Sequence, residues 1–456
     1  MLQEQHPTDK VFEEVLQLIP KRDPTLVRID RYLEDDTLFQ LIKKDLSKRH
    51  PKTMKTGRNS TPVEVIIRML VVKRLYRYSY EETERHVNDS LALRWFCRVY
   101  LNSVPDDTTL IKWANLIQDE TLQKFNERIT QLAVEHKVTK GKKLRTDGTV
   151  VETNVHPPSD SRQLADSVRV LERAIQRARK MQGVLEQAGE DYVQKARQTA
   201  RKIGETLRKR TEEAQEVGKQ LYETLLQITQ TTITQAQQSL KMLQEESGEA
   251  VQRLEKELTA FIPLAAQVVD QARRRILEKE AVPAREKLVS IFEPHTDIIR
   301  RGKEAHPVEY GHKIWLNEVD GGIVSHYRIL EGNPSDELQW EPSLQAHQKT
   351  FKAPPQRASA DRGLYSASNE KVAQDLGVEQ VILPKRGYKS QQRRDYEHQD
   401  WFVEGRKWHA GVEGRISVLK RAHGLGRCLN HGHIGFQRWV GWAVIAGNLA
   451  VMGRAL

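Results

Sequence analysis

The stretch KKLRTDGTVVETNVHPPSD, residues 142–160, contains the residue on which the interpretation of the fold depends. It begins as an extended run, reaches Asp147 and a glycine, and continues as a second extended run that ends in two prolines. An Asp-Gly pair between extended runs is a strong signal for a two-residue hairpin turn, and such a turn needs no function. Alternatively, Asp147 is the first of several carboxylates that the fold gathers around a metal ion. The stretch alone does not choose between these two interpretations.

The length of the chain indicates the number of domains, and its net charge indicates the kind of partner. The 456 residues are enough for about three domains of roughly 150 residues each. Lys and Arg outnumber Asp and Glu by 73 to 62, which favours a polyanionic partner such as nucleic acid or an anionic membrane surface. The longest apolar run, residues 439–452, is too short to span a bilayer, and no signal peptide is evident. With only Cys97 and Cys428 as cysteines, we expect a soluble, intracellular protein without a disulfide framework.

The first 135 residues are expected to be helical. Residues 1–60 end in a basic, turn-rich stretch that would suit a phosphate backbone, although a solvated linker fits as well. Residues 61–135 carry signals for three helix starts, which are the capping boxes Thr61-x-x-Glu64 and Ser79-x-x-Glu82 and the candidate caps Asp106 and Asp107.

Residues 61–135 resemble a helix-turn-helix cluster, which commonly places a helix in the major groove of DNA. The helix expected to begin at Pro62 carries a basic face that we assign to DNA binding, formed by Arg68, Lys73, Arg74 and Arg77. A small helical bundle that binds nothing fits the same segment.

Residues 161–300 are expected to form a helical or coiled-coil insertion. They are rich in Gln, Glu, Lys, Arg and Ala, and apolar residues recur three or four positions apart, as in amphipathic helices. A hairpin of two or more helices is favoured over one rod, because five glycines interrupt the pattern, namely Gly183, Gly189, Gly204, Gly218 and Gly248.

Residues 140–160 and 305–456 are expected to form an α/β domain into which this helical segment is inserted. Two extended runs flank Asp320-Gly321-Gly322, which indicates a hairpin. Helices and strands then alternate in the order helix, strand, helix, strand, helix. Such alternation is typical of a sheet covered by helices.

Three acids stand where an α/β sheet collects functional groups, at strand ends and in adjoining loops. Asp147 and Asp361 each end a short extended run, and Glu413 lies in a helix on one face with Lys420. Buried together, three carboxylates would repel one another unless divalent cations that prefer oxygen ligands lay between them. We therefore expect Asp147 to be fixed at the edge of a sheet beside Asp361 and Glu413, as ligands of two metal ions.

Four segments occur in a recognisable order: TDGTVVETNVHPPSDSRQLADSVRVL, YGHKIWLNEVDGGIVSHYRILEGNPSDE, ADRGLYSASNE and AGVEGRISVLKRAHGLGRC. Together they resemble bacterial insertion-sequence transposases of the Asp-Asp-Glu (DDE) class, which have a ribonuclease H-like catalytic core. The resemblance extends from about residue 60 to the C-terminus. It implies that Asp147, Asp361 and Glu413 are the catalytic acids and hold Mg²⁺ or Mn²⁺.

The resemblance also implies DNA contacts around the third acid. Lys420 matches the lysine that follows the glutamate by seven positions and contacts DNA near the cut. Upstream of the glutamate, Arg406 and His409 occupy the places where the family often has a tyrosine and an arginine, and we assign both to DNA binding.

The implied function is a DNA transposase that cuts transposon ends and joins the freed 3′-hydroxyl to target DNA. Its partners would be terminal inverted repeats, target DNA and further copies of the chain on DNA, with no membrane. Its location would be the cytoplasm of a bacterium, at the nucleoid. The alternatives are a metal-dependent nuclease without strand transfer and a non-catalytic DNA-binding architectural protein.

Two other features compete with this assignment. Cys428, His431 and His433 have a spacing that suits zinc, but the sequence shows no fourth ligand. Glu404 is close enough to Glu413 to replace it as the third acid, but we expect it to precede the helix rather than lie in it.

Overall fold

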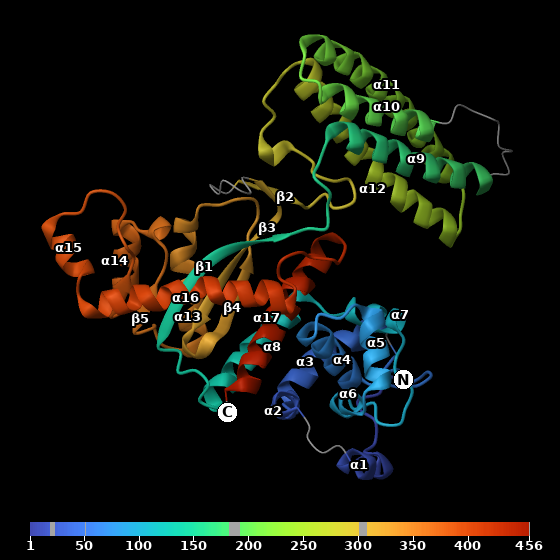
Figure 1. Cartoon of the computed structure of the whole chain (residues 1–456). Helices are drawn as coiled ribbons and strands as arrows, with labels where there is room; N and C mark the ends of the chain where they lie inside the picture. Colours follow the sequence, from blue (N-terminus) through green and yellow to red (C-terminus); the bar gives the residue numbers. More distant parts are fainter. Residues whose placement is uncertain (19–22, 51, 182–191, 301–307, 456) are drawn as a thin grey trace. The chain divides into compact units, whose positions relative to one another are not determined.

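Figure 1 shows the computed structural model, which describes residues 1–18, 23–50, 52–181, 192–300 and 308–455. The chain forms two compact units. The first consists of Met1–Thr153 and His312–Leu456, and the second of Asn154–Gly311. The second unit is thus inserted in sequence between two parts of the first.

Helices dominate the first part of the first unit, as the sequence predicts. They are α1 (Lys10–Gln17), α2 (Pro24–Leu33), α3 (Asp36–Leu46), η1 (Ser47–Arg49), α4 (Val63–Leu75), α5 (Tyr80–Asp89), α6 (Leu91–Phe96), α7 (Asp107–Ala114) and α8 (Asp119–Glu135).

Two of the three predicted helix starts are confirmed. At α5, the backbone amide of Glu82 donates to Ser79 Oγ at 3.0 Å, and the amide of Ser79 donates to Glu82 Oε2 at 2.8 Å, which completes the capping box. At α7, Asp106 Oδ1 accepts a hydrogen bond from the amide of Thr109 at 2.6 Å.

The helix at the third predicted start begins one residue later than predicted, and its capping box Thr61-x-x-Glu64 is wrong. α4 begins at Val63, and no side chain caps it. Its first amide donates instead to the backbone carbonyl of Gln3, at 3.0 Å. The carboxylate of Glu64 is engaged by Arg68 at 3.1 Å, so a tertiary contact and an ion pair replace the local motif.

The strands form a mixed six-stranded sheet in the order β2-β3-β1-β5-β6, with β4 paired to β3. The pairs β2-β3 and β3-β4 are antiparallel, and β1-β5 and β5-β6 are parallel. The strands are β1 (Lys143–Glu152), β2 (Asp297–Arg300), β3 (Val308–Val319), β4 (Ile323–Ile329), β5 (Arg357–Ser359) and β6 (Gln380–Ile382).

The helices that follow the predicted hairpin alternate with strands, as expected. The hairpin itself is confirmed, because β3 and β4 are joined by η4 (Asp320–Gly322). The remaining elements are η5 (Asp336–Gln339), α13 (Trp340–Phe351), η6 (Arg362–Leu364), α14 (Ala367–Asp375), α15 (Gln391–Glu397), α16 (Asp400–His423) and α17 (Gly432–Arg454).

β1 runs without a break through Asp147 and Gly148, so the hairpin-turn interpretation of the opening stretch is wrong. Gly148 does not have the positive φ of a turn glycine. Its missing side chain serves packing, because a Cβ there would lie 2.9 Å from Cζ3 of Trp315 on β3. β1 also has a neighbour on each side, β3 and β5, so the expected place of Asp147 at a sheet edge is wrong as well.

Helices cover both faces of the sheet in the first unit. On one face, Thr146 Oγ1 lies 3.4 Å from Ser343 Oγ of α13. Arg145, the preceding residue of β1, points to the opposite face, where its guanidinium donates to the backbone carbonyl of Trp408 in α16. Asp147 lies two residues after Arg145 and therefore also faces α16.

One apolar core joins the N-terminal helices to the sheet. Buried side chains from α4, α8, β4 and α17 all belong to it, among them Val65, Leu122, Ile323 and Ile445. The division of this unit into residues 1–60, residues 61–135 and an α/β domain stays a prediction.

The second unit is largely helical, as predicted for residues 161–300. Its helices are α9 (Asp160–Met181), α10 (Tyr192–Leu207), α11 (Glu212–Leu243) and α12 (Glu249–Ala272), followed by η2 (Arg273–Leu277) and η3 (Ala284–Glu286). α9 packs against the other three α-helices, and α11 packs against α10 and α12 (Figure 1). Their apolar stripes meet in a core of their own, whereas a coiled-coil geometry stays a prediction.

The glycines of this segment behave differently from one another. Gly204 lies within α10 and Gly218 within α11, so neither interrupts a helix. Gly248 precedes α12 with a φ of 142°, which does mark a break between helices. Gly183 and Gly189 lie outside the described residues. No helix in the described part of the chain is long and apolar enough to cross a membrane.

Candidate active site

The register of two parallel strands brings Asp147 and Asp361 to the same level. In the β1-β5 pair, Arg145 is opposite Ser359, an offset of 214 residues (359 − 145 = 214). The two aspartates have the same offset (361 − 147 = 214), and Asp361 follows β5 by two residues. Residues in register on neighbouring parallel strands are about 5 Å apart and point to the same face. The paired register ends at Arg145 and Ser359, so each aspartate lies two residues beyond the last pair. The charge of Asp361 acts on His409, which places Asp361 near α16.

α16 lies close against this face. A Cβ on Gly411 would lie 2.5 Å from Nη1 of Arg145, so a larger residue there would have to displace this guanidinium or the helix. Two residues earlier, Nδ1 of His409 lies 3.4 Å from Ser359 Oγ on β5. The middle of α16 thus spans the two strands that carry the aspartates.

Glu413 is one helical turn beyond His409 and so lies on the same side of α16. Its side chain is exposed, as is that of Asp361, whereas Asp147 is half-buried. The three candidate acids thus belong to elements that adjoin one another, since α16 packs on β1 and on β5. Their hard carboxylate oxygens are the donors that Mg²⁺ or Mn²⁺ prefers.

The described residues contain no group of three or more His, Cys, Asp or Glu side chains close enough to hold a metal ion. In the described structure the three acids therefore do not form a set of metal ligands. The same finding applies to Cys428, His431 and His433. Cys428 is buried, and its thiol donates to the carbonyl of Asn430 at 3.4 Å.

Backbone amides hold one oxygen of each aspartate. Asp147 Oδ1 accepts from the amide of Gly148 at 2.7 Å, and Asp361 Oδ1 accepts from the amide of Arg362 at 2.6 Å. Each carboxylate is thus restrained by its own chain neighbour.

A buried ion pair anchors α16 to the sheet. Arg145 donates to Glu318 of β3 through Nε at 2.7 Å and Nη2 at 2.6 Å, while Nη1 reaches the carbonyl of Trp408. The guanidinium also lies 4.8 Å from the centre of the Trp408 ring. Because the pair is bidentate and buried, it fixes the height of α16 above β1.

His409 is neutral at pH 7. Burial lowers its pKa to about 4; the charge of Asp361 opposes this shift, and that of Arg145 adds to it. A neutral imidazole offers no positive charge to a DNA phosphate. The predicted role of His409 in DNA binding would therefore have to rest on hydrogen bonding.

The remaining predicted residues lie along α16. Arg406 is exposed and Lys420 is half-buried, seven residues before and after Glu413, so both lie on its side of the helix. Glu404 lies inside α16, which begins at Asp400, so the expectation that it precedes the helix is wrong. Nine residues separate Glu404 from Glu413, which puts them on opposite sides of the helix.

The basic face predicted on α4 is not a surface. Arg68, Lys73 and Arg74 are all buried, and only Arg77 is exposed. Arg68 pairs with Asp30 and Glu64. The sequence pattern misled because almost every residue of α4, polar or apolar, packs inside the unit. The expectation of an exposed basic face is therefore wrong for the three buried side chains.

Sequence reasoning missed Arg145, Glu318 and Gly411. A weak signal existed for Arg145, since it precedes Asp147 by two positions and so shares its face of a strand. Nothing in the sequence pairs Arg145 with Glu318, which lies 173 residues further along the chain.

Residues 13–116 match the family described as Transposase domain (DUF772). The match supports a transposase. It covers α2 to α7 completely and ends before β1, so it does not extend to the three acids. No curated protein and no solved structure matches the chain. A transposase domain implies an enzyme that processes nucleic acid and binds DNA.

Proposed function

We propose that this chain is a DNA transposase of the DDE class with a ribonuclease H-like core. It would cut the ends of its element and join the 3′-hydroxyl to target DNA. The single observation that carries the proposal is that Asp147 and Asp361 each lie two residues beyond Arg145 and Ser359, an in-register pair of two parallel strands on which the helix that bears Glu413 packs.

Two further observations support the proposal. The N-terminal helices match a transposase domain. The sheet is mixed, its first strand is central and bears the first acid, and the helical insertion interrupts the chain directly after that strand. Each agrees with the order of segments that resembles DDE transposases.

Asp147, Asp361 and Glu413 would hold Mg²⁺ or Mn²⁺. Two such ions supply activation of a water or a 3′-hydroxyl and stabilisation of the leaving oxygen. The chain itself provides the rigid platform, since β1 and β5 fix the spacing of the aspartates and Arg145 fixes α16. The exposed Glu413 would complete the set when α16 or its side chain adjusts on binding.

The positive side chains along α16 would position DNA. Arg406 and Lys420 flank Glu413 on its side of the helix, so a phosphate backbone lying along α16 would meet both. Their role is to hold the scissile phosphate near the acids, and contacts of this kind carry no sequence information.

The test is a cleavage and joining assay with the purified full-length chain in Mg²⁺. The substrate is a duplex carrying the inverted repeat that flanks the gene, mixed with a supercoiled target plasmid. Cleavage at the repeat end followed by covalent joining supports a transposase. Cleavage without joining would leave a nuclease, and binding without cleavage would leave an architectural protein.

A further inference from the structure

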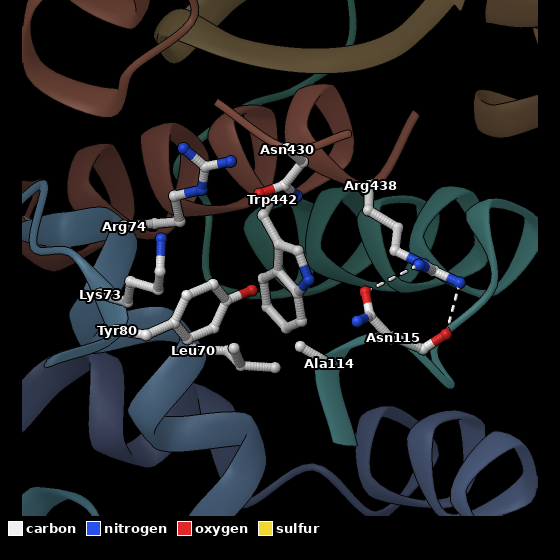
Figure 2. Close-up of a pocket in the computed structure, with 9 residues that line it drawn as sticks. All are labelled: Leu70, Lys73, Arg74, Tyr80, Ala114, Asn115, Asn430, Arg438 and Trp442. Carbon is white, nitrogen blue, oxygen red and sulfur yellow. Dashed lines mark hydrogen bonds between the residues drawn. The ribbon is translucent and has the colours of Figure 1, made fainter. Parts of the chain in front are cut away.

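A cavity of about 20 Å³ in the first unit is lined by three cationic side chains and by no acid. It lies between α4, α5, the end of α7 and α17, and none of the three candidate acids lines it. Figure 2 shows Lys73 and Arg74 on one side of Trp442 and Arg438 on the other. The exposed Asn115 also lines the cavity, which therefore reaches the surface. A space of this size admits one water-sized group.

The three cations have no carboxylate partner. Lys73 and Arg74 are only 7% and 6% exposed, yet among the described residues neither they nor Arg438 form an ion pair. Arg74 donates to the carbonyl of Trp439 at 3.1 Å, and Arg438 donates to the carbonyl of Ile117 at 2.6 Å.

Lys73 is the least satisfied of the three. Its ammonium lies 4.3 Å from the centre of the Tyr80 ring and 5.6 Å from that of Trp439. These ring contacts are the only ones that the described structure gives its ammonium, apart from more distant charges. Burial and the nearby charge of Arg74 lower the pKa of Lys73 to about 7. A buried ammonium beside a guanidinium is unfavourable unless a negative charge joins them.

We propose that this cavity is an anion site that receives one oxygen of a phosphate group. Lys73 supplies a point charge, and the Arg438 and Arg74 guanidinium groups add positive potential from two sides. The cavity admits an oxygen but not a whole phosphate, so the rest of the group stays at the mouth near Asn115. The phosphate comes either from a DNA backbone or from free phosphate. Only the DNA source rests on the proposed function.

The first experiment measures thermal unfolding of the full-length chain at pH 6.5 in sodium phosphate and in sodium chloride of equal ionic strength. Phosphate should raise the unfolding midpoint by roughly 2–4 °C over chloride when it is well above its dissociation constant. The variant Lys73→Met should lose this increment. Lys112→Met is the matched control, since Lys112 is an exposed lysine of α7 outside the cavity, and it should keep the increment.

A second variant guards against a folding defect in Lys73→Met. Asn115→Asp places a permanent carboxylate on an exposed lining residue whose Oδ1 already accepts from Arg438 Nη1 at 3.1 Å. It should abolish the phosphate increment, because the cavity then has its own anion. The proposal is overturned if the wild-type chain shows no increment over chloride, or if Lys73→Met and Asn115→Asp both retain it.

The DNA source is tested by the salt dependence of duplex binding. If a backbone phosphate enters the cavity, Lys73→Met should reduce the slope of log K against log salt by about 0.9. If Lys73→Met loses the increase of the unfolding midpoint in phosphate but keeps the wild-type slope of log K against log salt, the site binds free phosphate and not DNA. A chain that fails to bind DNA but keeps the increment would refute the proposed function and leave this site standing.

Discussion

At the scale of single residues, Arg145 shows how a buried charge can serve a site without belonging to it. Its guanidinium joins β1, β3 and α16 through Glu318 and the carbonyl of Trp408. Asp147 lies two residues after Arg145 on β1. Glu413 lies five residues after Trp408 on α16. The geometry of the candidate acids therefore depends on a pair that carries no chemistry of its own.

The first prediction concerns this ion pair. Arg145→Met leaves Glu318, whose side chain is 2% exposed, as an unpaired buried carboxylate, so the free energy of unfolding should fall by about 3–5 kcal/mol. The double variant Arg145→Met with Glu318→Leu removes both charges and should recover most of that loss. Chemical denaturation of the wild-type chain, the single variants Arg145→Met and Glu318→Leu, and the double variant measures the coupling energy of the pair. Additive losses in the double variant would show that the pair does not act as a unit.

The second prediction concerns Lys73. Burial and the nearby Arg74 lower its pKa from 10.5 to about 7, so between pH 7 and 10.5 the unfolded chain binds more protons than the folded chain. Stability should therefore rise with pH across this window, by up to about 1.4 kcal/mol per pH unit. Tyr80, Glu82 and Cys428 also lie near Lys73, and Tyr80 and Cys428 can titrate at alkaline pH.

Comparison with Lys73→Met isolates the lysine from those neighbours. We subtract the unfolding free energy of the wild-type chain from that of the variant, both measured from pH 7 to 9 in chloride buffers. This value should fall steadily as pH rises, because only the wild-type chain gains stability from the neutral lysine. Parallel profiles for the two proteins would contradict the lowered pKa.

At the scale of secondary-structure elements, α16 determines the geometry of the candidate site. It packs on β1, β5 and β6 and carries Glu413 together with Arg406 and Lys420. Gly405 and Gly411 permit the close approach, because a Cβ at either would lie under 3 Å from Ile382 or Arg145.

The third prediction compares two glycines of this helix. At Gly411 a Cβ would lie 2.5 Å from Nη1 of Arg145, whereas at Gly414 no atom lies within 4 Å. Gly411→Ala should therefore destabilise the chain by about 1–3 kcal/mol and reduce cleavage, since either α16 or the hydrogen-bonded guanidinium of Arg145 must shift. Gly414→Ala should stabilise it by about 0.5–1 kcal/mol through helix propensity. Equal effects of the two substitutions on the unfolding midpoint would refute the packing argument.

The elements also show what a sequence can and cannot reveal. The hairpin at Asp320, the capping box at Ser79 and the alternation from α13 to α16 follow from local patterns, and the structure confirms them. The Asp-Gly pair at Asp147 misled because strand pairing on both sides of β1 overrides a local turn signal. The basic residues of α4 misled because burial depends on the whole unit, not on helical periodicity.

The candidate site was only partly predictable, because local patterns single out residues but do not specify which strands pair. Asp147 and Asp361 could be singled out from their places at extended runs, but their shared register depends on the β1-β5 pairing, which no local pattern specifies. Arg145 and Glu318 were missed because their contact joins strands distant in sequence.

At the scale of the whole molecule, two compact units are built from one chain. The second unit has its own apolar core in α9 to α12, and the first unit shares a core between its N-terminal helices and its sheet. Separate cores favour units that fold on their own.

The fourth prediction follows from those separate cores. Replacing α9 to α12 by a Gly/Ser linker of about ten residues keeps β2 and β3 in the sheet, and it should leave the first unit folded, with a cooperative thermal transition. Under the proposed function, the shortened chain should still bind a single DNA end but should pair two ends less well in analytical ultracentrifugation. Loss of the cooperative transition would contradict the independence of the first unit, and undiminished pairing would contradict a role of the helical unit in assembly.

The central claim is that Asp147, Asp361 and Glu413 together bind the divalent metal ions of a DNA-cutting site. The most direct measurement is Mn²⁺ binding to the full-length chain on a DNA end, followed by electron paramagnetic resonance, alongside cleavage in Mg²⁺. Asp147→Asn, Asp361→Asn and Glu413→Gln should each weaken Mn²⁺ binding and abolish cleavage while DNA binding persists, because an amide keeps the shape but not the charge. Glu404→Gln, on the opposite side of α16, should leave both unchanged. Normal Mn²⁺ binding and normal cleavage by Asp147→Asn would contradict the account.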